Sequence, residues 1–339
     1  MAKFCSADGS LGGPVRTSTK RDSDESLAIR AAWLHYAAGM TQGEVAQKLG
    51  VSSTKAHRLI AWAYQNGAVK VSVVGGVAEC VALEDAIRDA FGLAHCEVVP
   101  DLHEEDGMPL RALGGAGASF LEREIEAAEG GVLGIGFGRT LAAAVTAMTP
   151  TGSGAMRFVS LMGGLTRNFA ANPHDVIHRL AERTGALAYV MPIPFVANSP
   201  ADLDVLLSQR GVDEIFRLAC RADLMLMGIG TAQLDAQLVG SGMILPDEID
   251  EVRRGGGVGE MLGHFLDEDG APVETPLSGR TVSPALDDIR GRRAVAIAGG
   301  PGKVAAIRAV LRSGVLTGLI TDERTARTLM RDQGERIAG

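Results

Sequence analysis

Glycine-rich turns recur in the second half of the chain, and cationic or hydroxyl-bearing side chains accompany them. Four turns carry this pattern, at residues 134–140, 162–168, 228–231 and 298–303. Glycine lets a ligand come close to the backbone, and the amides at the start of a following helix attract anions and hydroxyl oxygens. Four such turns together favour non-covalent binding of a small, oxygen-rich molecule.

The candidate binding residues come from these turns and from an acidic segment near residue 267. Arg139 and Lys303 are the cations best placed for a phosphate or for the oxygen atoms of a polyol. For Thr140 and Asp322, a helix-capping role explains the residue equally well. The full set of candidates is Gly134, Gly136, Gly138, Arg139, Thr140, Gly163, Gly164, Arg167, Asn168, Gly228, Gly230, Thr231, Asp267, Gly299, Gly300 and Lys303.

Neither a cofactor nor a metal ion is expected. The first turn lacks the GxGxxG arrangement of dinucleotide sites, and no acidic residue ends a second strand about twenty residues later. His174-Asp-Val-Ile-His178 resembles the HExxH motif of zinc proteases, but its acid would be Asp175 and no third ligand is evident. We interpret this segment as the start of a helix, with Asp175 complementing the helix dipole.

The glycine turns follow segments that are expected to be strands. Continuous short apolar runs alternate with helical patterns, which is typical of a parallel, Rossmann-like sheet covered on both faces. Ligands of such sheets lie outside the carboxyl ends of the strands. The predicted strands are 94–99, 131–135, 157–162, 187–191, 224–227, 294–298 and 316–320, and the predicted helices are 110–128, 140–148, 173–183, 201–208, 212–221, 246–254, 304–311 and 322–331.

A second kind of chemistry is indicated by residues 41–66, which are typical of two short helices around a tight turn. Thr41 and Glu44 have the spacing of a capping box, and Gly50 suits the sharp turn. The second helix then leaves cationic and hydrogen-bonding side chains exposed near its start, as in a helix-turn-helix that reads the major groove. The expected DNA-binding residues are Thr41, Gln42, Ser53, Thr54, Lys55, His57 and Arg58. An ordinary helical hairpin is the alternative for this stretch alone.

The flanking segments would complete a winged helix-turn-helix. Residues 26–38 are expected to form a helix that packs on the other two, and residues 68–74 alternate like a half-buried strand. The apolar side chains expected in this packing are Leu27, Ile29, Ala32, Trp33 and Tyr36. We therefore expect a disordered tail at 1–24, a DNA-binding domain at 25–76, and a ligand-binding and oligomerisation domain at 77–339.

Charge is distributed unevenly between these parts. The chain of 339 residues has a formal net charge of −8, yet residues 1–75 hold nine Lys and Arg against five Asp and Glu. A small basic unit on an acidic body favours DNA contact through the basic unit alone. No apolar run reaches about eighteen residues, so a membrane partner is not expected. The four scattered cysteines suit free thiols in a reducing cytoplasm.

In combination, these motifs resemble the SorC-type family of bacterial sugar-responsive transcription regulators. The resemblance covers nearly all of residues 26–331, and it rests on segments 40–53, 134–141, 161–167, 228–231, 257–267, 298–303 and 319–326. Within the family, segments 26–35 and 167–176 look most like regulators of erythritol catabolism.

The resemblance implies an effector domain similar in fold to sugar-phosphate isomerases and CoA transferases. It also implies a sugar, polyol or sugar-phosphate effector, double-stranded operator DNA as a partner, and a homo-oligomer that is commonly a tetramer. Residues 53–58 depart from the Pro-Thr-Val-Ser-Arg frequent in the family, so the operator sequence does not carry over. Arg139 leaves open whether the effector carries a phosphate.

The alternative function is an enzyme related to those isomerases and transferases, with an added helical domain. It would need a general base or a nucleophilic carboxylate in the pocket. Asp267 and Glu260 are the acids that can be named near the glycine turns, and neither lies in a recognisable enzyme motif. We therefore predict a transcription regulator without catalytic residues.

Overall fold

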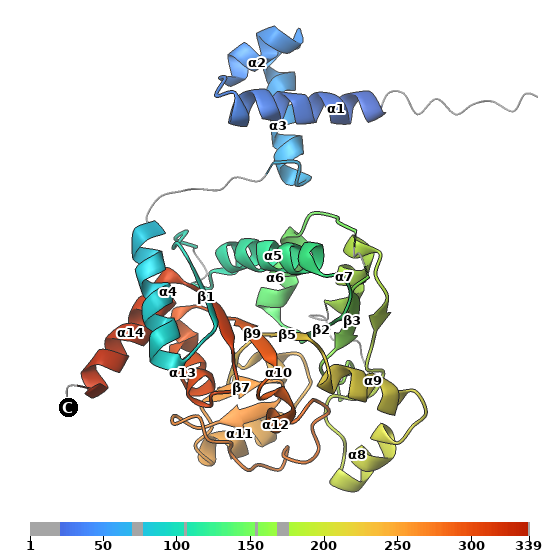
Figure 1. Cartoon of the computed structure of the whole chain (residues 1–339), viewed down its shortest axis with the longest axis vertical. Helices are drawn as coiled ribbons and strands as arrows, with labels where there is room; N and C mark the ends of the chain where they lie inside the picture. Colours follow the sequence, from blue (N-terminus) through green and yellow to red (C-terminus); the bar gives the residue numbers. More distant parts are fainter. Residues whose placement is uncertain (1–20, 70–76, 105–106, 153–154, 168–175, 338–339) are drawn as a thin grey trace, which may run out of the picture. The chain divides into compact units, whose positions relative to one another are not determined.

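The computed structural model of the chain describes residues 21–69, 77–104, 107–152, 155–167 and 176–337. Contacts between residues divide the chain into two compact units, Met1–Val73 and Val74–Gly339. We refer to the first unit as the head and to the second as the body, and each is described by itself (Figure 1).

The head is a set of helices around a small apolar core. Helix α1 (Arg21–Ala32) continues into a π-helical turn, η1 (Trp33–Ala37), and is followed by α2 (Gln42–Leu49) and α3 (Ser53–Gln65). The buried side chains are Ala28, Ala31, Ala32, Leu34, Val45, Ala46, Ala56, Leu59, Ile60 and Ala63. Alanines dominate this core, so α1 and α3 pack closely.

The turn between α2 and α3 has the predicted geometry. Thr41 Oγ1 accepts a hydrogen bond from Glu44 N, and Glu44 Oε2 accepts one from Thr41 N at 2.7 Å, which confirms the capping box. Gly50 ends α2 with a φ of 63°, in the left-handed region that glycine tolerates. Ser52 caps α3 by accepting from Lys55 N at 3.2 Å.

Two expectations for the first helix of the head are wrong. The helix begins at Arg21, so the predicted tail at 1–24 overlaps it. Trp33 and Tyr36 do not pack inside, because their side chains are 61% and 46% exposed, and Ile29 is exposed as well. The alanines take the face against α3, where an aromatic ring would not fit. The predicted strand at 68–74 lies largely outside the described residues.

The body is built on a seven-stranded parallel sheet with the order β1-β10-β9-β5-β2-β3-β4. Its strands are β1 (His95–Val99), β2 (Val132–Ile135), β3 (Arg157–Ser160), β4 (Ala188–Tyr189), β5 (Leu224–Met227), β9 (Arg293–Ile297) and β10 (Gly318–Asp322). Each of them overlaps a predicted strand, which confirms the predicted α/β fold.

Successive side chains of the central strands enter two different apolar cores, one on each face of the sheet. In β5, Leu224 and Leu226 belong to one core, while Met225 and Met227 belong to the other. Because both faces are buried, these strands read in the sequence as continuous apolar runs. This is why the sheet could be predicted.

Helices cover both faces of the sheet (Figure 1). One core receives side chains from α5 (Leu110–Ala127), α6 (Arg139–Ala147) and α7 (Ile177–Thr184). The other receives them from α4 (Val77–Phe91), α13 (Val304–Arg312) and α14 (Glu323–Ile337). The remaining helices are α8 (Pro200–Leu207), α9 (Val212–Cys220), α10 (Gln237–Gly240), α11 (Pro246–Arg254) and α12 (Leu286–Ile289). In the described part of the chain, none of the helices has both the length and the apolar character needed to cross a membrane.

Two features of the body were not predicted. Helix α4 occupies residues 77–91, for which no helix was predicted, and a small antiparallel sheet lies beside the main one. The small sheet consists of β6 (Gly230–Thr231), β7 (Gly259–Met261) and β8 (His264–Leu266). It matters for function because it carries part of the pocket described next.

Candidate functional site

A pocket opens in the body beyond the carboxyl ends of β2, β3 and β5. Its free volume is about 50 Å³. That space holds only a few water molecules, so a larger ligand requires side chains to move. The lining residues are Phe137, Gly138, Arg139, Thr140, Met162, Gly228, Ile229, Gly230, Thr231, Ala236, Gln237, Leu238, Glu260, Leu262 and Lys303. Seven of the predicted binding residues are therefore brought together here: Gly138, Arg139, Thr140, Gly228, Gly230, Thr231 and Lys303.

Two ionisable side chains of opposite sign line this pocket. Lys303, in the short turn η2 (Pro301–Lys303), donates a hydrogen bond from Nζ to Ile229 O at 2.6 Å. Glu260 of β7 is 7% exposed. Burial raises the pKa of Glu260 to about 7, while burial and the nearby Arg139 charge lower the pKa of Lys303 to about 8. Both groups can therefore change protonation near neutral pH when a ligand alters their surroundings.

Glu260 is held in place by a tight β-hairpin. Met261 and His264 are paired, and the two residues between them, Leu262 and Gly263, have φ of 52° and 81°. A two-residue turn of type I′ needs positive φ at both places, and leucine rarely adopts it. Glu260 Oε1 accepts from Gly263 N at 2.6 Å and so stabilises the turn. The strained Leu262 lines the pocket, which is where such strain is typically stored.

Arg139 adds a second cation at the start of α6. Its Nε donates to Gln237 Oε1 at 3.0 Å. A cation at the positive end of a helix is unfavourable by itself, so its position favours a ligand-binding role over a structural one. The preceding Gly138 has a φ of 141°, and a methyl group placed on it would meet nothing within 4 Å. Open space therefore lies beside the helix start.

Several predicted glycines serve close packing instead of ligand approach. A methyl group on Gly134 would lie 2.4 Å from Leu161, and one on Gly163 would lie 2.5 Å from Pro194 O. Contacts this short leave no room for a larger residue. Gly136, Gly164, Gly299 and Gly300 also do not line the pocket. Thr140 lines it, but its hydroxyl donates to Ile297 O at 3.0 Å, which ties α6 to β9.

Three other predicted residues are not brought to the pocket. Arg167 pairs with Glu248, which also binds Arg280 at 2.9 Å, in a half-buried cluster of ions. Asp267 follows β8 as a turn residue, since its Oδ1 accepts from Asp269 N at 3.0 Å and Ala271 N at 2.8 Å. Asn168 lies outside the described residues.

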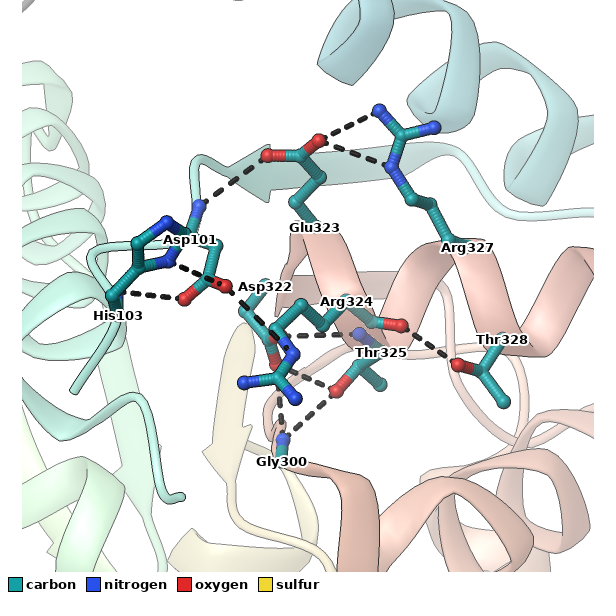
Figure 2. Close-up of polar contacts among 9 residues, drawn as sticks. All are labelled: Asp101, His103, Gly300, Asp322, Glu323, Arg324, Thr325, Arg327 and Thr328. Carbon is teal, nitrogen blue, oxygen red and sulfur yellow. Dashed lines mark hydrogen bonds and ion pairs between the residues drawn. The ribbon is translucent and has the colours of Figure 1, made fainter. Parts of the chain in front are cut away.

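Asp322 is a structural carboxylate at the end of β10 (Figure 2). Its Oδ2 accepts from Gly300 N at 2.9 Å and from Thr325 Oγ1 at 2.6 Å, and its Oδ1 accepts from Thr325 N at 3.1 Å. It therefore caps α14 and fixes the glycine turn. A methyl group on Gly299 would lie 2.2 Å from Asp322 Oδ2, which explains why residue 299 is a glycine. The capping interpretation of Asp322 is the one that the geometry supports.

Two polar residues of the pocket were missing from the predicted binding set. Glu260 was named only for the enzyme alternative, and Gln237 was not named. Both come from elements that were not predicted, namely β7 and α10. A signal did exist for Glu260, because it is an acid inside the largely apolar run Gly259-Glu-Met-Leu-Gly-His-Phe-Leu266. A charge within such a run is rare unless it has a use.

The predicted DNA-binding residues lie around the turn of the head. Ser53, Thr54, Lys55, His57 and Arg58 are all exposed at the start of α3. Lys55 Nζ lies 3.8 Å from Asp24 Oδ1, an exposed contact that DNA phosphate can replace. Thr41 is exposed and Gln42 is partly buried at the start of α2. Exposed polar and cationic side chains at the start of the second helix are what a helix-turn-helix uses to read DNA, so the assignment of these residues stays a prediction.

The zinc alternative can be followed only in part. His174 and Asp175 lie outside the described residues, and His178 is in the first turn of α7. Across the residues that the structure does describe, no three His, Cys, Asp or Glu side chains gather in a way that could hold a metal ion.

Comparison with known proteins identifies relatives along nearly the whole chain. Residues 76–331 match the family described as "Putative sugar-binding domain". The chain is 58% identical over 309 residues to the erythritol catabolism regulatory protein EryD of Brucella abortus (strain 2308), covering 91% of this chain and 98% of that one. It is 30% identical over 314 residues to the transcriptional regulator LsrR of Klebsiella pneumoniae subsp. pneumoniae, covering 91% and 94%.

A solved structure has the same fold. The full-length sorbitol operon regulator SorC from Klebsiella pneumoniae matches with a TM-score of 0.70 at 24% identity, covering 90% of this chain and 98% of that one. The relatives that share sequence over nearly their full length are regulators, which sets aside the enzyme alternative. The chain belongs to the SorC-type family of sugar-binding transcriptional regulators.

Proposed function

We propose that the protein controls a carbohydrate or polyol catabolic operon, and that a small polyol such as erythritol, or a related sugar or sugar phosphate, is its effector. The observation that carries the proposal is the pocket, where Arg139, Lys303 and the buried Glu260 converge. Erythritol is the first compound to test because the relative with 58% identity is an erythritol catabolism regulator.

The polar groups of the pocket suit a molecule rich in hydroxyls. A hydroxyl group both donates and accepts hydrogen bonds, so it can donate to the Glu260 carboxylate and accept from Lys303 or Arg139. The amides at the start of α6 and the open space beside Gly138 add donors for further oxygens. In this proposal Thr231 and the backbone near Gly228 and Gly230 complete the shell around the ligand.

Operator binding is assigned to residues 25–76 and effector binding with self-assembly to residues 77–339. The start of α3 enters the major groove, where Lys55, His57 and Arg58 read base edges and phosphates. The bodies assemble in the cytoplasm into an oligomer, a tetramer in our proposal, so that several heads engage one operator. An effector that prefers one arrangement of the bodies then changes operator affinity by about 1–3 kcal/mol.

Thermal unfolding with candidate ligands tests the effector assignment. Erythritol at about 100 times its dissociation constant should stabilise the protein by about 2.7 kcal/mol and raise its Tm. The variant Lys303→Met should lose this shift while remaining folded. If erythritol, its phosphates and related polyols and pentoses all leave the Tm unchanged, the effector assignment is wrong.

Operator binding of a head variant tests the DNA assignment. The double variant Lys55→Ala/Arg58→Ala should weaken operator binding by at least about 30-fold, because each lost contact to a base or phosphate costs about 1–3 kcal/mol. The control is Arg30→Ala, which removes an exposed cation of α1 that is not among the predicted DNA-binding residues. Unchanged operator affinity in the double variant would exclude this surface.

A further inference from the structure

Gln237 holds the guanidinium group of Arg139 at the pocket. Its Oε1 accepts from Arg139 Nε at 3.0 Å, and the two residues are 98 positions apart in the sequence. Both line the pocket. The bond therefore joins the short helix α10 to the start of α6 in the lining of the pocket.

This partner leaves the positive charge of Arg139 in place. An amide is neutral, and among the described residues no carboxylate forms an ion pair with Arg139. A guanidinium has five N–H donors, so the bond through Nε leaves its two terminal nitrogens for another acceptor. The charge is felt inside the pocket, because Arg139 contributes to the lowered pKa of Lys303.

The identity of residue 237 thus fixes two properties of Arg139 separately. The hydrogen bond through Oε1 fixes where the planar guanidinium lies, which matters for a group that binds in a defined direction. The neutrality of the amide preserves the charge that an anionic ligand would meet. A carboxylate at the same place would keep the hydrogen bond and cancel the charge.

We propose that Gln237 is a positioning residue that sets how strongly this pocket favours a phosphorylated effector over an uncharged polyol. It acts through Arg139: it fixes the guanidinium for oxygen atoms of either ligand and keeps its charge for the phosphate. This inference rests on the proposed function, because it takes the pocket to be the effector site.

Calorimetric titration of the full-length protein with erythritol and with erythritol 4-phosphate tests it. Gln237→Glu should weaken binding of the phosphate by at least about tenfold and binding of erythritol by less than about threefold, so their affinity ratio changes. Gln237→Ala keeps the charge but loses the anchor, so it should weaken both ligands alike and leave the ratio within about threefold.

The matched control is Gln233→Glu, which adds the same charge on an exposed residue before α10 that does not line the pocket. It should leave both affinities within about twofold, as for an exposed and screened charge. An unchanged ratio in Gln237→Glu overturns the inference, and so does a ratio that Gln233→Glu changes equally. If the unaltered protein binds neither compound, the proposed effector is wrong, and the inference that depends on it is wrong as well.

Discussion

Asp322 and Glu260 are both buried carboxylates, 3% and 7% exposed, yet their surroundings differ completely. Asp322 accepts three hydrogen bonds from Gly300 and Thr325 (Figure 2), so its carboxylate oxygens stabilise the fold. Glu260 receives one, from Gly263, and lines a pocket beside Lys303. A buried acid whose acceptors are used within the chain is structural, whereas one that faces free space is available to a ligand.

The largest expected effect comes from removing the satisfied carboxylate. Asp322→Ala leaves Gly300 N without its carboxylate acceptor and α14 without its cap, so we expect a loss of about 2–4 kcal/mol in the free energy of unfolding. Urea unfolding measures it. The control Asp287→Ala removes an acid whose side chain is 88% exposed, and it should change stability by less than about 0.5 kcal/mol. Equal losses of unfolding free energy in the two variants would show that the hydrogen bonds of Asp322 do not stabilise the fold.

A pair of glycine substitutions sharpens the comparison. A methyl group would lie 2.2 Å from Asp322 Oδ2 in Gly299→Ala and 2.2 Å from Glu260 Oε2 in Gly230→Ala. Asp322 cannot move without breaking its hydrogen bonds, so Gly299→Ala should lose about 2 kcal/mol more stability than Gly230→Ala.

In Gly230→Ala, the Glu260 side chain can instead turn toward the pocket. That variant should keep most of its stability and lose affinity for erythritol, as measured by titration. The opposite pattern, with binding lost in Gly299→Ala and stability lost in Gly230→Ala, would reverse the roles that we assign.

The last expected effect concerns the pH dependence of stability. The pKa of Glu260 is raised from 4.5 to about 7. Between these two pH values the carboxyl group is therefore protonated in the folded state and ionised in the unfolded state. Stability should therefore fall as pH rises from about 4.5 to 7, and level off above that. Glu260→Gln removes this loss, so its advantage in unfolding free energy should be about 3 kcal/mol larger at pH 8 than at pH 4.5. A constant difference between the two pH values would show that Glu260 does not titrate in this range.

The fold could be predicted because its sheet is buried on both faces. Runs such as Leu224–Met227 are apolar throughout, and the glycine turns after them mark the edge where ligands bind. For the same reason Arg139 and Lys303 were placed at the pocket from sequence. Their positions depend only on strand order and on the short turns that follow the strands.

The features that could not be predicted from the sequence depend on contacts between segments far apart in the chain. Glu260 reaches the pocket through a hairpin whose turn contains Leu262 at positive φ, and leucine gives no turn signal. Gln237 is placed by its bond to Arg139, which no local pattern reveals. In the head, the size of the side chains decided the buried face of α1. Alanines fit against α3, while Trp33 and Tyr36, which hydrophobicity alone would bury, are exposed.

The exposure of the aromatic residues in the head has a practical consequence. The chain has two tryptophans, Trp33 and Trp62, and both lie in the head, 61% and 38% exposed. Fluorescence excited selectively at tryptophan therefore reports on the head alone, while the body contributes no signal. Unmodified protein can thus be titrated with operator DNA and with effector in turn. A change in emission when effector binds would be a direct optical record of a signal that travels from one unit to the other.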